Sequence, residues 1–328
     1  MVNFKKFFNK KKIKYKNKIV NFLKLEIFKR IYFQKNYNEQ KTILVVGTGR
    51  SGTTWLAETL SNFLGFRLIF EPFHQKITSK ITKLKLTRYI PPDFENQSYY
   101  KIFKWILGGN IKNRWVDNNN RVFKSESRII KSIRLNLTLK WIKTQFPEIP
   151  IILILRHPCG VVSSRKVLGW EGSRLDLILE DDKLIEKHLK DYLNIIKASN
   201  DLIQRNALVW CIETYIPLKI MKKNELIITT YEKLITNFDK ELKRILSRIL
   251  KPKNLNSNRN IKNFISVQAN KNSAIIKENH PLEVWKHRLN QNEINKILNL
   301  VKEFSLDHIY DIQILPKTTN FINYSNFS

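Results

Sequence analysis

The stretch Thr42–Leu60, TILVVGTGRSGTTWLAETL, decides the fold of this chain. It starts with an apolar, β-branched run typical of a buried parallel strand, and Trp55, Leu56 and Leu60 then recur at helical spacing. Three glycines between these patterns allow a tight turn whose backbone N–H groups point at one anion. The N-terminus of the following helix adds the positive end of its dipole. The stretch therefore predicts a strand, a phosphate-binding loop and a helix.

The loop departs from the Walker A pattern G-x-x-x-x-G-K-[ST] at one position. Gly47–Gly52 fits the pattern, but Thr53 stands in place of the lysine that binds the β- and γ-phosphates. We expect Arg50 beside the distal end of a bound phosphate ester, with the hydroxyls of Ser51, Thr53 and Thr54 as uncharged donors. This set suits a nucleotide with a short 5′ chain. The alternative is a strand-helix turn without a ligand.

The loop resembles the 5′-phosphosulfate loop of the sulfotransferases that use 3′-phosphoadenosine 5′-phosphosulfate (PAPS). In that family the loop reads R-S-G-T-T or K-S-G-T-T, followed by an aromatic residue, which here is Trp55. The resemblance implies PAPS as the sulfuryl donor and no metal. It assigns donor binding in this loop to Gly49, Arg50, Ser51, Gly52, Thr53 and Thr54.

A second strand-turn-helix pattern lies in IPIILILRHPCGVVSSRKVLGW, residues 149–170. A buried strand is expected over Ile151–Leu155, and Pro158 marks the start of a helix. This stretch resembles the 3′-phosphate motif of the same family, with Arg156 and Ser164 at the matching spacing. Arginine gives a planar, bidentate grip on phosphate. A salt bridge at the helix start is the alternative role for Arg156.

Segments in the C-terminal half extend the resemblance. Tyr231 and Glu232 follow an apolar strand as in the family's Y-E-D-L segment, and Tyr231 is assigned to the donor site. Trp285 lies in a segment that resembles the closing W-x-x-x-L signature, and we expect it to pack in the core, as we do for Trp210–Tyr215. Two surface loops are expected over Asn254–Asn263 and Asn270–His280. In this family a loop at the second position covers the nucleotide, which makes Lys271 and Lys277 candidate 3′-phosphate contacts.

The whole pattern predicts an α/β fold of the P-loop type, with a doubly wound, mostly parallel sheet and helices on both faces. Strands are expected over Thr42–Val46, Arg67–Phe70, Arg121–Phe123, Ile151–Leu155 and Leu226–Thr229. The candidate site residues follow the carboxyl ends of these strands, where open α/β sheets bind ligands.

Two side chains after the second and third expected strands are candidate catalytic residues. Glu71 precedes a proline, as in the carbohydrate sulfotransferases that this region resembles, and we favour it as general base over a structural ion pair. His74 is the rival base. Lys124 can neutralise the sulfuryl oxygens or pair with Glu126. Arg50 completes the predicted catalytic set, because negative charge builds on the leaving phosphate during transfer.

The acceptor is expected to be a hydroxyl compound, and the resemblance favours a carbohydrate. Aromatic side chains between residues 78 and 120 can stack on it or pack in the core: Tyr99, Tyr100, Trp105 and Trp115. A P-loop kinase and a non-catalytic polyanion-binding protein are the alternative functions, and the missing Walker lysine argues against the kinase.

Composition limits these readings further. The 328 residues include 59 Lys and Arg against 28 Asp and Glu, a formal charge of +31, but the lysines are spread along the chain and no nucleic-acid partner is expected. Two cysteines, Cys159 and Cys211, with no apolar run that spans a membrane, favour a soluble protein in a reducing, cytoplasmic compartment.

The N-terminal arm, residues 1–40, alternates basic with apolar residues. A helix in this arm would be basic and amphipathic, which allows peripheral contact with an anionic membrane or docking on the catalytic domain. The sulfotransferase domain is expected over residues 41–315 and a tail over 316–328.

Overall fold

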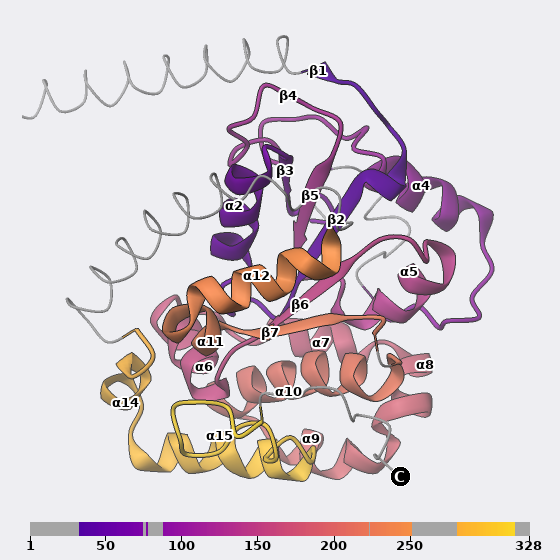
Figure 1. The fold of residues 1–328 in the computed structure, drawn as a ribbon. Helices are drawn as coiled ribbons and strands as arrows, with labels where there is room; N and C mark the ends of the chain where they lie inside the picture. The colour runs from indigo at the N-terminus through magenta and orange to yellow at the C-terminus, as the bar shows by residue number, and fades with distance from the viewer. Residues whose placement is uncertain (1–32, 75–76, 78–87, 223, 251–280, 319–328) are drawn as a thin grey trace, which may run out of the picture.

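The computed structural model describes residues 33–74, 77, 88–222, 224–250 and 281–318. Its main sheet contains five parallel strands in the order β3-β5-β2-β6-β7 (Figure 1). These strands are β2 (Thr42–Val46), β3 (Arg67–Phe70), β5 (Arg128–Ser132), β6 (Ile151–Leu155) and β7 (Ile227–Thr230). The predicted doubly wound parallel sheet with helices on both faces is confirmed. A separate parallel pair joins β1 (Phe33–Gln34) and β4 (Lys124–Ser125).

Alternate residues of the buried strands face two hydrophobic layers. Ile43 and Val45 of β2 pack in the layer that also contains apolar residues of α2 (Thr53–Leu64), α11 (Tyr231–Thr236) and α12 (Phe238–Ile249). In Figure 1, α2 and α12 lie together in front of the sheet. This layer fixes the start of α2 next to the end of β2.

The opposite layer is larger and includes Leu44, Val46 and the buried Trp210 and Trp285. The predicted packing role of both tryptophans is confirmed. Helices that contribute apolar residues to this layer include α4 (Gln97–Leu107), α5 (Leu139–Gln145), α6 (Pro158–Val167), α10 (Leu202–Ile220), α14 (Val284–Arg288) and α15 (Gln291–Glu303).

Shorter helical segments join these elements. They are η1 (Glu39–Lys41), η2 (Asn136–Thr138), α7 (Ser173–Leu179), α8 (Asp182–Leu184), the single π-helical turn η3 (Ile185–Leu189), η4 (Lys190–Tyr192) and α9 (Leu193–Ala198). Among the helices in the described ranges, none combines the length and the apolar character needed to span a bilayer.

The strand predicted over Arg121–Phe123 is wrong. That run is irregular, and the third expected strand is β5, which pairs with both β2 and β3. Its sequence, RIIKS, was not predicted as a buried strand because two charged residues interrupt the apolar pattern. In the structure, both of these residues, Arg128 and Lys131, are buried. They tolerate burial because each has polar partners. The last strand begins at Ile227, one residue later than predicted.

Two buried arginines lie side by side at the amino end of the sheet, where Arg67 of β3 is in register with Arg128 of β5. Arg67 donates to the carbonyls of Gly109 and Ile111, each at 2.7 Å, and forms an ion pair with Asp117 at 2.8 Å. These contacts attach the 109–117 segment to the sheet.

Arg128 donates to the backbone carbonyls of Asn36, Asn38 (2.8 Å) and Leu107 (3.1 Å). Residues 36–38, which belong to the predicted arm, are therefore tied to the sheet. Residues 1–32, both predicted surface loops, Lys271 and Lys277 lie outside the described residues. The predicted domain limits stay a prediction.

Candidate functional site

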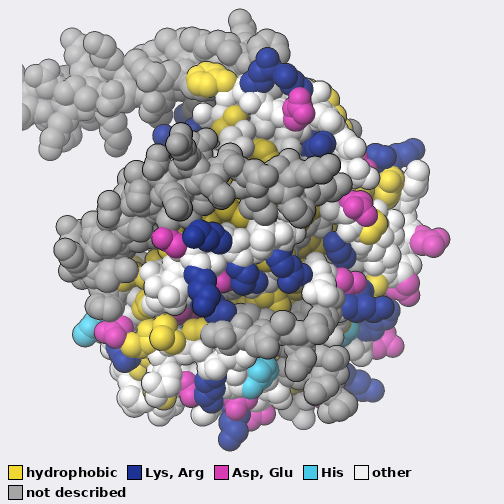
Figure 2. Space-filling model, in the orientation of Figure 1, with side chains coloured by type: hydrophobic (Ala, Val, Ile, Leu, Met, Phe, Trp, Pro, Cys, Tyr) yellow, Lys and Arg dark blue, Asp and Glu magenta, His cyan; other side chains and the backbone are white. Residues whose placement is uncertain are grey.

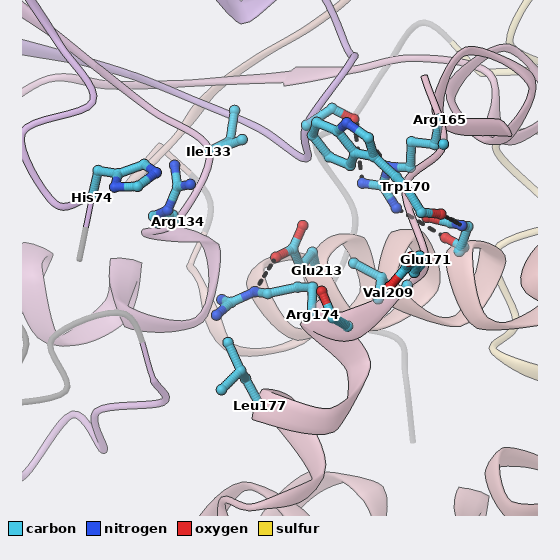
Figure 3. Close-up of a pocket in the computed structure, with 15 residues that line it drawn as sticks. His74, Ile133, Arg134, Arg165, Trp170, Glu171, Arg174, Leu177, Val209 and Glu213 are labelled. Atoms are coloured by element: carbon cyan, nitrogen blue, oxygen red, sulfur yellow. Dashed lines mark hydrogen bonds and ion pairs between the residues drawn. The ribbon is translucent and has the colours of Figure 1, made fainter. Parts of the chain in front are cut away.

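Two adjoining cavities open at the carboxyl ends of the strands. The P-loop cavity, with a volume of ≈ 520 Å³, lies against Arg50, Glu71, Arg156 and Tyr231. The α10 cavity, ≈ 430 Å³, lies between residues 169–174 and α10 (Figure 3). The residues that line both cavities are His74, Ile133, Arg134 and Trp170. A ligand in one cavity thus meets a ligand in the other at these side chains.

The glycine-rich loop 47–52 turns sharply before α2. Arg50 and Gly52 have φ values of 82° and 92°, in the left-handed region that favours glycine. Gly52 is the N-cap of α2 and has no side chain to bind the first N–H groups of the helix. Thr53 and Thr54 then line the P-loop cavity. The glycine-rich loop thus leads into a helix N-terminus at the wall of the P-loop cavity, where the sequence predicts anion binding.

Ser51 and Gly49, two residues predicted to bind the donor, have other contacts in the structure. The fully buried Ser51 hydroxyl donates to the carbonyl of Thr48 at 2.6 Å, so it closes the turn instead of facing the cavity. Gly49 lies under Trp170, whose ring would be 2.8 Å from a Cβ atom at this position. A side chain at position 49 would thus displace the tryptophan.

Arg50, Ser164 and Arg156 come together at the P-loop cavity. Nε of Arg50 donates to the Ser164 hydroxyl at 3.0 Å, and Nη1 of Arg156 donates to the Arg50 carbonyl at 3.0 Å. Burial, followed by the charge of Arg156, lowers the pKa of Arg50. The Arg156 guanidinium lies 4.3 Å from the centre of the Tyr231 ring. The two sequence motifs thus form one cationic cluster with a hydroxyl and an aromatic face.

Glu71 lies at the end of β3 with a φ of 46° and is 2% exposed. Its Oε1 accepts hydrogen bonds from Lys131 Nζ at 2.6 Å and the Ile133 N–H at 3.0 Å, while Oε2 accepts one from Arg134 Nη1 at 2.7 Å. Three donors, two of them charged, fix the position of the carboxylate. The predicted alternative of a structural ion pair is therefore present, in the wall of the P-loop cavity.

The structure corrects the placement of the predicted catalytic lysine. Lys124 is an exposed residue of β4, paired with Phe33 beyond the amino end of β5, and does not line either cavity. Lys131 lines the P-loop cavity instead. Burial lowers its pKa, and the neighbouring Glu71 carboxylate acts in the opposite direction. The missed strand β5 explains the error, because Lys131 lies near its carboxyl end.

His74, the rival base, lines both cavities and follows Glu71 through a turn in which its N–H donates to the Glu71 carbonyl at 3.1 Å. Its ring centre is 5.1 Å from that of Trp115, which also lines the P-loop cavity. The other aromatic candidates lie elsewhere: Tyr99 and Tyr100 pack against the core, and Trp105 is exposed on α4.

A buried polar network connects the loop with the α10 cavity. Glu213 of α10 accepts from the Thr48 hydroxyl at 2.8 Å and from Arg174 Nε at 3.1 Å (Figure 3). Arg165, fully buried, donates to Thr48, to the Gly49 carbonyl and to the Asn206 carbonyl. Burial lowers the Arg165 pKa to about 10. The network fixes the glycine-rich loop against α6 and α10.

Sequence reasoning missed Arg134, Arg165, Trp170, Arg174 and Glu213. One signal was present in the quoted sequence: a tryptophan between Gly169 and Gly172 directly after the 3′-phosphate motif, with φ of 67° and 73° at the two glycines. Glu213 gave no such signal, because its run on α10 reads as core. Within the described ranges, no group of three or more His, Cys, Asp and Glu residues is placed to hold a metal ion.

Charged side chains are distributed unevenly over the surface. Figure 2 shows Lys and Arg side chains in the middle of one face as well as around its edges, with fewer acidic side chains among them.

The two cysteines are free and buried, and burial raises the pKa of Cys159 to about 12. The predicted reducing compartment stays a prediction.

The fold and this site can be compared with known proteins. Among the solved structures similar to the chain are two sulfotransferase domains. One is a sulfotransferase domain from the curacin biosynthetic pathway, with 12% identity, a TM-score of 0.33, and coverage of 64% of this chain and 75% of that one. The other is a sulfotransferase domain from the olefin synthase of Synechococcus PCC 7002, with 13% identity, a TM-score of 0.41, and coverage of 86% and 99%.

A search of curated proteins found no match. The family model described as the sulfotransferase domain matches residues 40–296, which include the glycine-rich loop, Glu71, Lys131, Arg156 and Ser164. The match spans most of the chain and contains both motifs from which the P-loop cavity is built. This chain therefore belongs to the sulfotransferase domain family and is a transferase.

Proposed function

We propose that the protein transfers the sulfuryl group of PAPS to a hydroxyl group of a carbohydrate. The observation that supports the donor is the hydrogen bond between Arg50 and Ser164, with Arg156 beside them. Arg50 and Arg156 line the P-loop cavity together with Thr53 and Thr54 at the start of α2, and Ser164 contacts this lining through Arg50. Such a cluster next to a helix N-terminus supports a ligand with more than one anionic group, such as a nucleotide with 3′ and 5′ substituents.

The charge and the aromatic residues of the P-loop cavity fit this donor. Its described walls carry Arg50, Lys131, Arg134 and Arg156 against the single carboxylate of Glu71. Such an excess of positive charge suits a ligand with several negative charges. Trp55 and Tyr231, whose rings meet edge to face at 6.2 Å, offer apolar surface for the adenine.

The proposed chemistry assigns roles to the N–H groups at the start of α2 and to Lys131. A bond forms between the acceptor oxygen and sulfur while the bond from sulfur to the bridging phosphate oxygen breaks. Negative charge then builds on that oxygen, where the N–H groups at the start of α2 stabilise it. We assign Lys131 to the sulfuryl oxygens, in place of Lys124, because its ammonium lies next to Glu71 in the same wall.

Glu71 stays our proposed general base, with His74 as the rival. Its Oε2 accepts the Arg134 bond and has a lone pair left for the acceptor proton. Lys131 and Arg134 hold the carboxylate in the wall of the P-loop cavity by hydrogen bonds of 2.6 and 2.7 Å. His74 has the advantage that it reaches both cavities.

Donor binding provides the direct test. We expect 3′,5′-adenosine bisphosphate to raise the melting temperature of the full chain much more than ATP or AMP does. Arg156→Ala should remove this preference, and Lys124→Ala, which changes a residue outside both cavities, should retain it. Equal stabilisation of the unmodified protein by ATP contradicts the proposed donor.

A further inference from the structure

We infer that the α10 cavity binds the non-reacting part of the acceptor, that this part is an uncharged sugar ring, and that Trp170 is the face on which the ring stacks. The inference rests on the proposed function, because it names the substrate class of the same site. It begins from the four residues shared by the two cavities. A molecule in the α10 cavity has its inner end at His74, Arg134 and Trp170, next to the P-loop cavity.

Trp170 is held in place by its backbone. Its N–H donates to the Arg165 carbonyl at 3.0 Å, and its own carbonyl accepts from Asn206 Nδ2 at 2.9 Å. One edge of its ring lies against Gly49, and the Arg165 guanidinium is 5.6 Å from the ring centre. The residue is nevertheless 37% exposed. An aromatic residue that is anchored in this way and still open to two cavities presents a rigid surface to a ligand.

The charges of the α10 cavity differ from those of the P-loop cavity. Arg174 is paired with Glu213 at 3.1 Å, and Arg134 with Glu71 at 2.7 Å. Glu171 supplies a further carboxylate to the lining, and the Glu213 carboxylate also acts on the buried Arg165. In the described walls of the α10 cavity, three arginines thus face two carboxylates, and Glu71, the partner of Arg134, lies in the wall of the P-loop cavity. With one arginine in excess, this wall attracts an anionic acceptor much less than the P-loop cavity does, whose described walls carry four cations against one carboxylate.

The remaining wall fits the two kinds of surface that a sugar ring presents. Ile133, Leu177 and Val209 add apolar area opposite or beside Trp170, as Figure 3 shows. Glu171 and Asn206 offer polar groups to ring hydroxyls. A cavity that combines an aromatic face and apolar side chains with polar groups can orient a small ligand by hydrogen bonds and bind it by apolar contact.

The test measures binding without turnover. The full chain is saturated with 3′,5′-adenosine bisphosphate. Saturation-transfer NMR and calorimetry then measure the binding of cellobiose, lactose and maltose. Cellobiouronic acid is the charged counterpart of cellobiose. We expect at least one neutral disaccharide to bind, and to bind more tightly than the acid. Trp170→Ala should weaken its affinity at least about fivefold, and Trp170→Phe should restore most of it.

Trp105→Ala is the matched control, because Trp105 is similarly exposed, at 44%, but does not line either cavity. Undiminished disaccharide binding by Trp170→Ala overturns the inference, as does tighter binding of cellobiouronic acid. Binding of 4-methylphenol with no binding of any disaccharide overturns it too. In each of these outcomes, a retained thermal shift with 3′,5′-adenosine bisphosphate leaves the proposed donor intact, so the two failures are distinguishable.

Discussion

Arg50 donates a hydrogen bond to Ser164, a residue 114 positions later in the chain, at 3.0 Å. The sequence predicted Arg50 at the 5′ end of the donor and Ser164 at the 3′ end. The structure instead directs the Arg50 guanidinium toward the 3′-phosphate motif, where Arg156 already lies. Because like charges gather there, an anion bound between them would relieve their repulsion.

This contact leads to a prediction about which phosphate Arg50 binds. If the guanidinium binds the 3′-phosphate, Arg50→Ala should weaken the binding of 3′,5′-adenosine bisphosphate by about ten- to a hundredfold, as expected for loss of a charged hydrogen bond. The affinity for AMP should change little. Titration calorimetry with the two nucleotides measures this. Equal losses of affinity for the two nucleotides would assign Arg50 to the 5′-phosphate instead.

Glu71→Gln should reduce turnover by at least about a hundredfold while nucleotide affinity stays nearly unchanged. The amide keeps the shape but accepts no proton and no longer pairs with Lys131 and Arg134. Single-turnover sulfuryl transfer and nucleotide titration measure the two effects. His74→Gln is the comparison, and a larger loss in that variant would assign the base to His74.

Lys131→Met should reduce turnover strongly, because it removes the ammonium assigned to the sulfuryl oxygens. Lys124→Met should leave turnover within about twofold, since Lys124 is exposed on β4 and lies outside both cavities. Melting curves of both variants show whether the loss comes from unfolding. The reverse order of effects would contradict the assignment of Lys131.

The buried imidazole of His157 should make the free energy of unfolding depend on pH. Its Nδ1 accepts from the Cys159 N–H at 3.2 Å, and its Nε2 lies 2.8 Å from the Asp311 carbonyl, so the neutral ring fits both contacts. Burial lowers its pKa from 6.5 to about 4. The unfolded chain therefore binds the proton more readily than the folded chain. Stability should fall as the pH drops from 6.5 toward 4, by up to about 3 kcal/mol.

Denaturant unfolding of the protein and of His157→Asn across this pH range tests the assignment. Asparagine keeps an acceptor for the helix cap but does not titrate, so the curve should become flatter. His188→Gln is a needed control, because burial lowers the pKa of His188 to about 4 as well. An unchanged pH dependence in His157→Asn would exclude His157 as its source.

Two truncations separate the roles of the N-terminal arm. Removal of residues 1–40 also removes the Asn36 and Asn38 carbonyls that bind Arg128, and it should lower the melting temperature. Removal of residues 1–32 keeps these contacts and should not. If the arm is a membrane anchor, the shorter truncation should abolish sedimentation with anionic vesicles and retain full stability.

Most of the main sheet could be predicted because its strands are apolar runs followed by turn residues. The closeness of the glycine-rich loop to Arg156 and Ser164 could be predicted because both motifs follow the carboxyl ends of strands in one parallel sheet. β5 was missed because Arg128 and Lys131 interrupt its apolar pattern, and their partners are distant in sequence. The α10 cavity could not be predicted either, because it depends on contacts between residues that are distant in sequence, such as Glu213 and Thr48.

The two ends of the sheet use arginine for different purposes, and salt should separate them. At the amino end, Arg67 and Arg128 are buried and bind backbone carbonyls, which ions in solution do not reach. At the carboxyl end, Arg50 and Arg156 line an open cavity. Raising the ionic strength should therefore weaken nucleotide binding well before it weakens the fold, so that the protein stays folded while its donor site is screened.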